Sequence, residues 1–196
     1  MKNLRKSLLS GLMLSALAFT SCSDDDTTDV APVVEPAAAA VEVILSEVQY
    51  QTADLVEIQN VGTGNVDLSD FFLCLGPGTY QRVGSLTVQS GSVTDLGPDE
   101  YLVVSYSMPD DSAGLGLYEN NDGFGDPSNI ADFVQWGASG SVREGVAVQA
   151  GVWTAGEFVP TLSNVDNSIV FDGEGNGAAD WAETSTPSLG LSLIHI

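Results

Sequence analysis

The sequence is poor in cationic residues. Its 196 residues include only five Lys and Arg. Three of these, Lys2, Arg5 and Lys6, stand at the N-terminus, so that only Arg82 and Arg143 accompany the 27 acidic residues of the rest. A surface this acidic repels nucleic acid and anionic lipid headgroups. It suits cations or a basic partner, and the simpler alternative is a surface kept soluble by self-repulsion.

Histidine is nearly lacking as well, because His195 is the only one. It lies in the apolar end 191–196 (LSLIHI), which matches the translation of a transposase adapter used in DNA sequencing and which we expect to be an artefact. Without this end and the N-terminal lysines, the chain has neither His nor Lys. That excludes Ser-His-Asp and Cys-His catalysis, Schiff-base chemistry and His-ligated zinc.

Carboxylate pairs are the only catalytic groups left, and such pairs hydrolyse glycosides in other proteins. No acidic pair here has the apolar flanks expected of a buried acid. We therefore expect no enzymatic activity. The alternative is that a hydrolase domain follows residue 190 in a longer gene.

Residues 1–21 are typical of a secretory signal. Basic residues precede an apolar run that is too short to span a bilayer, and small polar residues follow it. The end of this segment, 17–22 (LAFTSC), resembles a bacterial lipoprotein signal, in which Cys22 becomes the lipidated first residue. The alternative is an ordinary signal peptide that ends near a cysteine.

Residues 22–40 are predicted to be a tether. The SDDD motif at 23–26 resembles the acidic export tag of surface lipoproteins in some Gram-negative bacteria, although a solvated charge run has the same composition. The Pro- and Ala-rich segment that follows has nothing to pack and predicts a disordered spacer. The expected location is the outer membrane, exposed at the cell surface. If Cys22 carries lipid, Cys74 has no disulfide partner and is expected to be a buried thiol.

Residues 41–190 are predicted to form one all-β domain, an antiparallel immunoglobulin-like β-sandwich of about eight short strands. The 21 Gly and 8 Pro, with no sustained helical stripe, favour many short strands. The central stretch is 54–75, with alternating apolar residues at Val56 and Ile58, a turn-rich corner, and a strand that is apolar on both faces.

Other segments give weaker predictions. Residues 80–83 and 85–88 suggest an exposed hairpin, 108–129 an irregular loop, and 146–150 a short strand or a helical turn.

Four motifs carry a family resemblance. They are 54–60 (DLVEIQN), 66–69 (VDLS), 97–104 (GPDEYLVV) and 132–137 (DFVQWG). In order and spacing they resemble the lamin tail domain in its bacterial secreted form. The resemblance implies an immunoglobulin-like sandwich and supplies no catalytic residues.

Two acidic loops are candidate calcium sites. The first places Asp172, Glu174 and Asn176 at alternate positions around glycines, with Asp180 beyond, as calcium loops do. It lacks the terminal Glu of an EF-hand, so a solvated acidic turn is the alternative. The weaker candidates of the second loop are Asn120, Asp122 and Asp126.

The three tryptophans, Trp136, Trp153 and Trp181, suggest either a sugar-stacking platform or core residues. The sequence as a whole favours a non-catalytic, lipid-anchored surface protein that binds a protein or a glycan. A calcium-ordered binding module and the first part of a secreted hydrolase are the alternatives.

Overall fold

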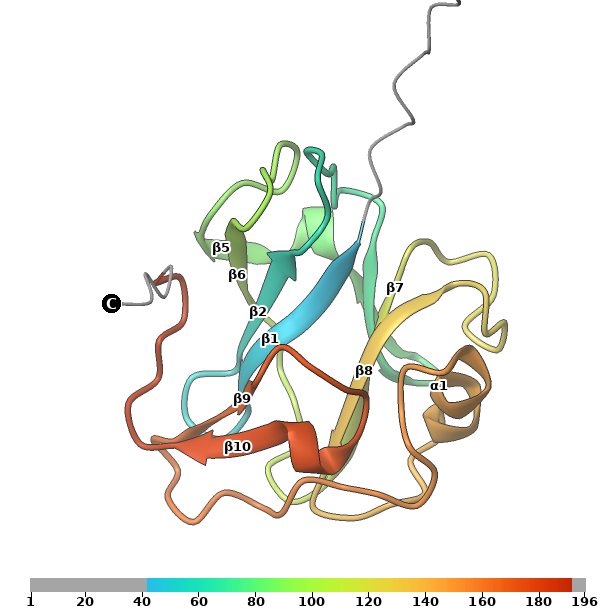
Figure 1. Ribbon diagram of the computed structural model, residues 1–196, viewed down its shortest axis with the longest axis vertical. Helices are drawn as coiled ribbons and strands as arrows, with labels where there is room; N and C mark the ends of the chain where they lie inside the picture. The colour runs from blue at the N-terminus through green and yellow to red at the C-terminus, as the bar shows by residue number, and fades with distance from the viewer. Residues whose placement is uncertain (1–41, 192–196) are drawn as a thin grey trace, which may run out of the picture. The chain divides into compact units, whose positions relative to one another are not determined.

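The computed structural model describes residues 42–191, which form ten strands in two antiparallel sheets (Figure 1). The predictions for the signal, Cys22, the tether and residues 192–196 lie outside this range. The larger sheet has the order β10 (Trp181–Thr184), β9 (Ser168–Phe171), β1 (Val43–Gln49), β2 (Leu55–Asn60), β6 (Tyr101–Ser105) and β5 (Thr87–Ser90). The smaller has β4 (Thr79–Arg82), β3 (Phe72–Gly76), β7 (Ala113–Tyr118) and β8 (Ile130–Trp136). The predicted antiparallel, immunoglobulin-like sandwich is confirmed.

The central stretch changes sheets at its corner. β2 pairs with β1 and β6 in the larger sheet, whereas β3 lies between β4 and β7 in the smaller one. Asn60, fully buried, holds the corner together: its amide donates to the Gly64 carbonyl at 2.8 Å and to the Leu96 carbonyl at 2.9 Å. Its side-chain oxygen accepts from the Gly62 amide at 2.9 Å. The corner therefore depends on a buried amide as well as on flexible glycines.

The loop prediction for 108–129 is wrong in part, because β7 lies within it. The two glycines inside β7, Gly114 and Gly116, look like loop residues in the sequence. In the structure each leaves room for a side chain that packs over the strand. A Cβ on Gly114 would come within 2.1 Å of the Ser141 hydroxyl, and one on Gly116 within 2.5 Å of the Tyr118 ring. Glycine in a strand here marks close approach.

The predicted hairpin of 80–83 and 85–88 is also wrong. β4 pairs with β3, and β5 pairs with β6 in the other sheet. The 3-10 turn η1 (Val83–Ser85) carries the chain between the sheets, with Val83 fully buried at the crossing. Residues 144–150 form the helix α1 (Glu144–Ala150), which packs beside β8 (Figure 1).

The tryptophans belong to the core, so the sugar-stacking alternative does not hold. Trp136, Trp153 and Trp181 are 0%, 3% and 7% exposed. Trp136 stacks on Tyr50 with ring centroids 4.5 Å apart, and Trp153 meets Phe133 edge to face. Both pairs belong to the buried hydrophobic core.

Candidate functional site

The two sheets leave an open seam between β1 and β8. β9 pairs with β1 only at Glu47 and Val48, so that within residues 42–191 the first half of β1 has a strand partner on the β2 side alone. β8 is the edge of the smaller sheet and is bridged on its outer side only at Trp136, by Val159. These two strands lie side by side, one at the edge of each sheet's paired region (Figure 1).

Asp132 spans this seam at its base. From β8 its Oδ2 accepts from the Leu45 amide of β1 at 2.6 Å, and its Oδ1 accepts from the Phe133 amide at 2.7 Å. Burial raises the pKa of Asp132 to about 7, against the lowering effect of those two amides. The carboxylate stands where the carbonyl of a neighbouring strand would bind Leu45.

A groove, which we call the seam groove, runs along this gap as two adjoining hollows. Ile44, Val61 and Ala131 line both hollows as a shared apolar floor. The first hollow, of about 680 Å³, is also lined by residues before β1, in the β2–β3 corner and after β7: Glu42, Asn65, Asp67, Phe71, Glu119 and Asn120. The second continues toward Gly151, Phe171 and the loop after β9.

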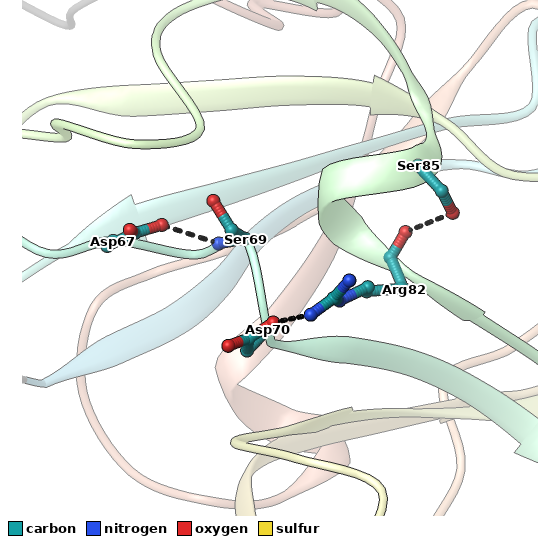
Figure 2. A network of polar contacts seen from close by, with 5 residues as sticks. All are labelled: Asp67, Ser69, Asp70, Arg82 and Ser85. Atoms are coloured by element: carbon teal, nitrogen blue, oxygen red, sulfur yellow. Dashed lines mark hydrogen bonds and ion pairs between the residues drawn. The ribbon is translucent and has the colours of Figure 1, made fainter.

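The rim of the seam groove is negative. Glu42, Asp67 and Glu119 are exposed, and neither Arg82 nor Arg143 lines the groove. Hydrogen bonds from Ser69 lower the pKa of Asp67, and its Oδ1 accepts from the Ser69 amide at 2.8 Å (Figure 2). Asp67 is therefore ionised at neutral pH.

The corner beside this rim also holds the only ion pair within residues 42–191. Asp70 and Arg82 join the start of β3 to the end of β4, and both side chains are more than half exposed (Figure 2). Pairs this exposed contribute little to stability.

The candidates in the loop after β7 accept hydrogen bonds from within that loop. The Asn120 side-chain oxygen accepts from the Asp122 amide at 2.8 Å, while Asp126 accepts from the Ser128 amide and hydroxyl. Asn129, which sequence reasoning missed, organises the loop: buried, it donates to the Asn120 and Gly123 carbonyls. Only Asn120 of the three candidates lines the groove.

The candidates after β9 bond mainly to their own loop. Asp172 Oδ1 accepts from the Glu174 amide at 3.0 Å, and Asp180 Oδ2 accepts from the Gly177 amide at 2.8 Å. Asn176 donates to the Gly151 carbonyl and lines the second hollow. Each predicted acidic loop thus supplies one asparagine to the seam groove.

No three His, Cys, Asp or Glu side chains are grouped to hold a metal within residues 42–191. Calcium binding, which can also use amide and carbonyl oxygens, stays a prediction. Thermal unfolding in calcium against a chelator tests it, because a site filled to a hundred times its dissociation constant adds about 2.7 kcal/mol.

Two buried glutamates form a second acidic region that the sequence did not reveal. Glu47 and Glu57 are paired across β1 and β2 and are 0% and 4% exposed. The C-terminal strap, defined as residues 185–190, covers them. Glu47 accepts from the Ser188 amide at 3.1 Å and from its hydroxyl at 2.8 Å, and Glu57 Oε2 accepts from the Gly190 amide at 2.5 Å.

Further donors complete this pair. Ser168 donates to Glu47 and Ser46 to Glu57, so that all four carboxylate oxygens accept hydrogen bonds. Burial raises the pKa of Glu57, which the Gly190 and Ser46 bonds oppose. The buried pair thus holds the C-terminal strap in place.

Cys74 is a buried thiol, as expected. It lies in β3 and is fully buried, and burial raises its pKa. Arg143 stands nearby with its guanidinium 5.9 Å from the Phe124 ring. Burial and a raised pKa both lower the reactivity of a thiol.

The fold and this site define a class: an all-β, immunoglobulin-like sandwich with an acidic groove at its seam. Comparison of the chain with protein-family models, with curated proteins and with solved structures found no match. No helix within residues 42–191 has the length and apolar character needed to cross a membrane.

Proposed function

We propose that this protein is a non-catalytic, lipid-anchored protein of a Gram-negative cell surface, whose lamin-tail-like domain binds a protein or a glycan in the seam groove. The observation that carries the binding site is the groove itself. Its apolar floor, exposed at Val61 to 40%, lies inside a rim of carboxylates and amides. Recognition sites commonly combine such a floor with a few polar groups at the edge.

The lamin-tail resemblance supports the proposal, because the fold of residues 42–191 is the kind that the resemblance implies. The anchor rests on the sequence of residues 1–26 alone. Metabolic labelling with a fatty acid tests it: wild type should be labelled and Cys22→Ala should not. Label that persists in Cys22→Ala contradicts lipidation at Cys22.

Binding is tested with arrays of immobilised peptides and glycans probed by the full chain, purified in detergent. Val61→Arg fills and recharges the floor, while Val165→Arg makes the same change at an exposed valine outside the groove. We expect at least one ligand class to be retained by wild type and Val165→Arg and lost by Val61→Arg. If Val61→Arg loses none of the ligands that wild type retains, the groove is not the site.

A further inference from the structure

We propose that the seam groove binds an extended polypeptide that carries lysine or arginine side chains, and that the backbone of this polypeptide pairs with the open edge of β1 at Val43. The inference rests on the proposed function, since it uses the same groove and names the chemistry of its occupant. Three features support it: the backbone edge of β1, the apolar floor of the seam groove and its acidic rim.

The backbone of β1 has groups that point into the gap between β1 and β8. The Leu45 amide points toward β8, because it donates to Asp132 at 2.6 Å. Backbone groups of alternate residues in a strand point the same way, so the N–H and C=O of Val43 point into the gap as well. The side chain of Val43 is 5% exposed and lies in the core, which leaves only its backbone facing the groove.

The contact with Asp132 shows that the edge of β1 donates hydrogen bonds to an acceptor from outside the sheet. Its carboxylate oxygen occupies the position of a partner strand's carbonyl at Leu45. At Val43, two residues earlier, the described part of the chain offers no such partner on that side. A strand added beside β1 would therefore pair with Val43 and stop at Asp132, which already occupies the Leu45 amide. Addition of an extended peptide to an open edge is a common mode of recognition.

The rim selects the charge of the occupant. Side chains of a bound strand alternate, so that one set meets Ile44, Val61 and Ala131 while the other reaches the rim. The rim offers carboxylates at Glu42, Asp67 and Glu119 and no cation. Ammonium and guanidinium groups complement this field and are attracted to it over a distance.

Charge also argues against other occupants. The preceding segment of the same chain, 23–41, carries five acidic residues and no basic one. A second copy of the protein is equally acidic, with a net charge of −22. Both would meet a rim of their own sign, whereas a basic polypeptide would not.

The test uses a fluorescent ten-residue peptide of alternating lysine and threonine, and fluorescence anisotropy with the full chain in detergent. Glu42→Lys with Glu119→Lys reverses two rim charges. Asp110→Lys with Asp111→Lys makes the same charge change at two exposed residues outside the groove. We expect the rim variant to weaken binding about tenfold or more and the control to stay within about twofold.

Two further peptides probe the backbone and the charge. One replaces every lysine by glutamate, and the other is N-methylated at four consecutive central residues so that neither edge can pair. We expect both to bind at least about tenfold more weakly than the lysine peptide. In hydrogen exchange, the Val43 amide should gain protection only with the unmethylated lysine peptide.

Equal binding of the methylated peptide, equal binding of the glutamate peptide, equal effects of the two charge variants, or no binding would each overturn the inference. Those results leave the proposed function open, because the arrays can still show a ligand that is lost with Val61→Arg. If the arrays show no groove-dependent ligand although the lysine peptide binds at Val43, the arrays did not contain a basic extended polypeptide. If neither experiment depends on the groove, both proposals fail.

Discussion

Glu42 directly precedes β1 and Glu47 lies within it, yet they belong to opposite kinds of acidic region. Glu42 is exposed on the rim of the seam groove, while Glu47 is 0% exposed beneath the C-terminal strap. The strap brings amide and hydroxyl donors to Glu47 and Glu57, whereas the described chain leaves the rim open. What closes an acidic region here is a distant segment, because Ser188 is 141 positions beyond Glu47 in the sequence.

The largest effect is expected from removing the buried carboxylate of Glu47. Glu47→Ala leaves three buried or half-buried donors without an acceptor, those of Ser168 and Ser188. We expect a loss of about 2 to 3 kcal/mol in the free energy of unfolding, measured by urea denaturation. The matched change Glu42→Ala should stay within about 0.5 kcal/mol.

A double-mutant cycle with Ser188→Ala isolates the strap contribution. If Glu47 acts through Ser188, the losses from the two single variants will not add in the double variant. Equal losses in Glu47→Ala and Glu42→Ala would mean that the strap does not close this region in solution.

The next effect is a pH dependence that arises from Asp132. This residue lies at the base of the open groove, yet burial raises its pKa as it does that of Glu57. Burial raises its pKa to about 7 from an ordinary value of 3.8. Between those values the folded chain holds a proton that the unfolded chain has lost, so stability falls as pH rises through this window. One such proton gives a slope of up to about 1.4 kcal/mol per pH unit. The raised pKa of Glu57 acts in the same direction.

Asp132→Asn removes this titration. We expect the decline in melting temperature from pH 5 to pH 8 to become shallower than in wild type, with only the contribution of Glu57 left. An unchanged slope in Asp132→Asn would show that this carboxyl does not titrate in the window.

The sequence predicted the fold because its main signals are local. The alternation of Val56 and Ile58, the glycine-rich corner and the apolar run that follows are enough to place β2 and β3. It failed at β7, because Gly114 and Gly116 are there to admit Ser141 and Tyr118, contacts that appear only after folding.

The candidate site shows the same limit. Asn120 and Asn176 stood out in the sequence for their acidic neighbours, but they line the seam groove for a different reason, the meeting of loops after β7 and β9 around β1. The burial of Glu47 and Glu57 left no sequence signal either, because a charged residue in a strand is ordinarily read as facing solvent. Charge and the alternation of apolar residues can be read from a short stretch of sequence. Whether a side chain is buried depends on contacts with distant segments.

A smaller effect is expected from the open region. Glu42→Lys with Glu119→Lys places two positive charges on a chain with net charge −22 and eases its self-repulsion. We expect a gain of a few tenths of a kcal/mol at low salt, which should vanish in about 0.5 M salt because screening removes the repulsion. A loss above about 1 kcal/mol would mean that the rim carboxylates hold structure, as Glu47 does.

The smallest effect should come from the exposed ion pair beside the rim of the seam groove. Arg82 and Asp70 are 54% and 72% exposed, so water competes for both groups and Arg82→Ala should cost less than about 0.5 kcal/mol. The Ser85 hydroxyl donates to the Arg82 backbone carbonyl at 2.7 Å, a bond that this change leaves in place (Figure 2). Ser85→Ala removes that bond instead and serves as the matched comparison in urea denaturation. A loss above about 1 kcal/mol for Arg82→Ala that persists in high salt would show that this pair clamps the corner between β2 and β3, and the open region would then depend on its charges as the closed one does.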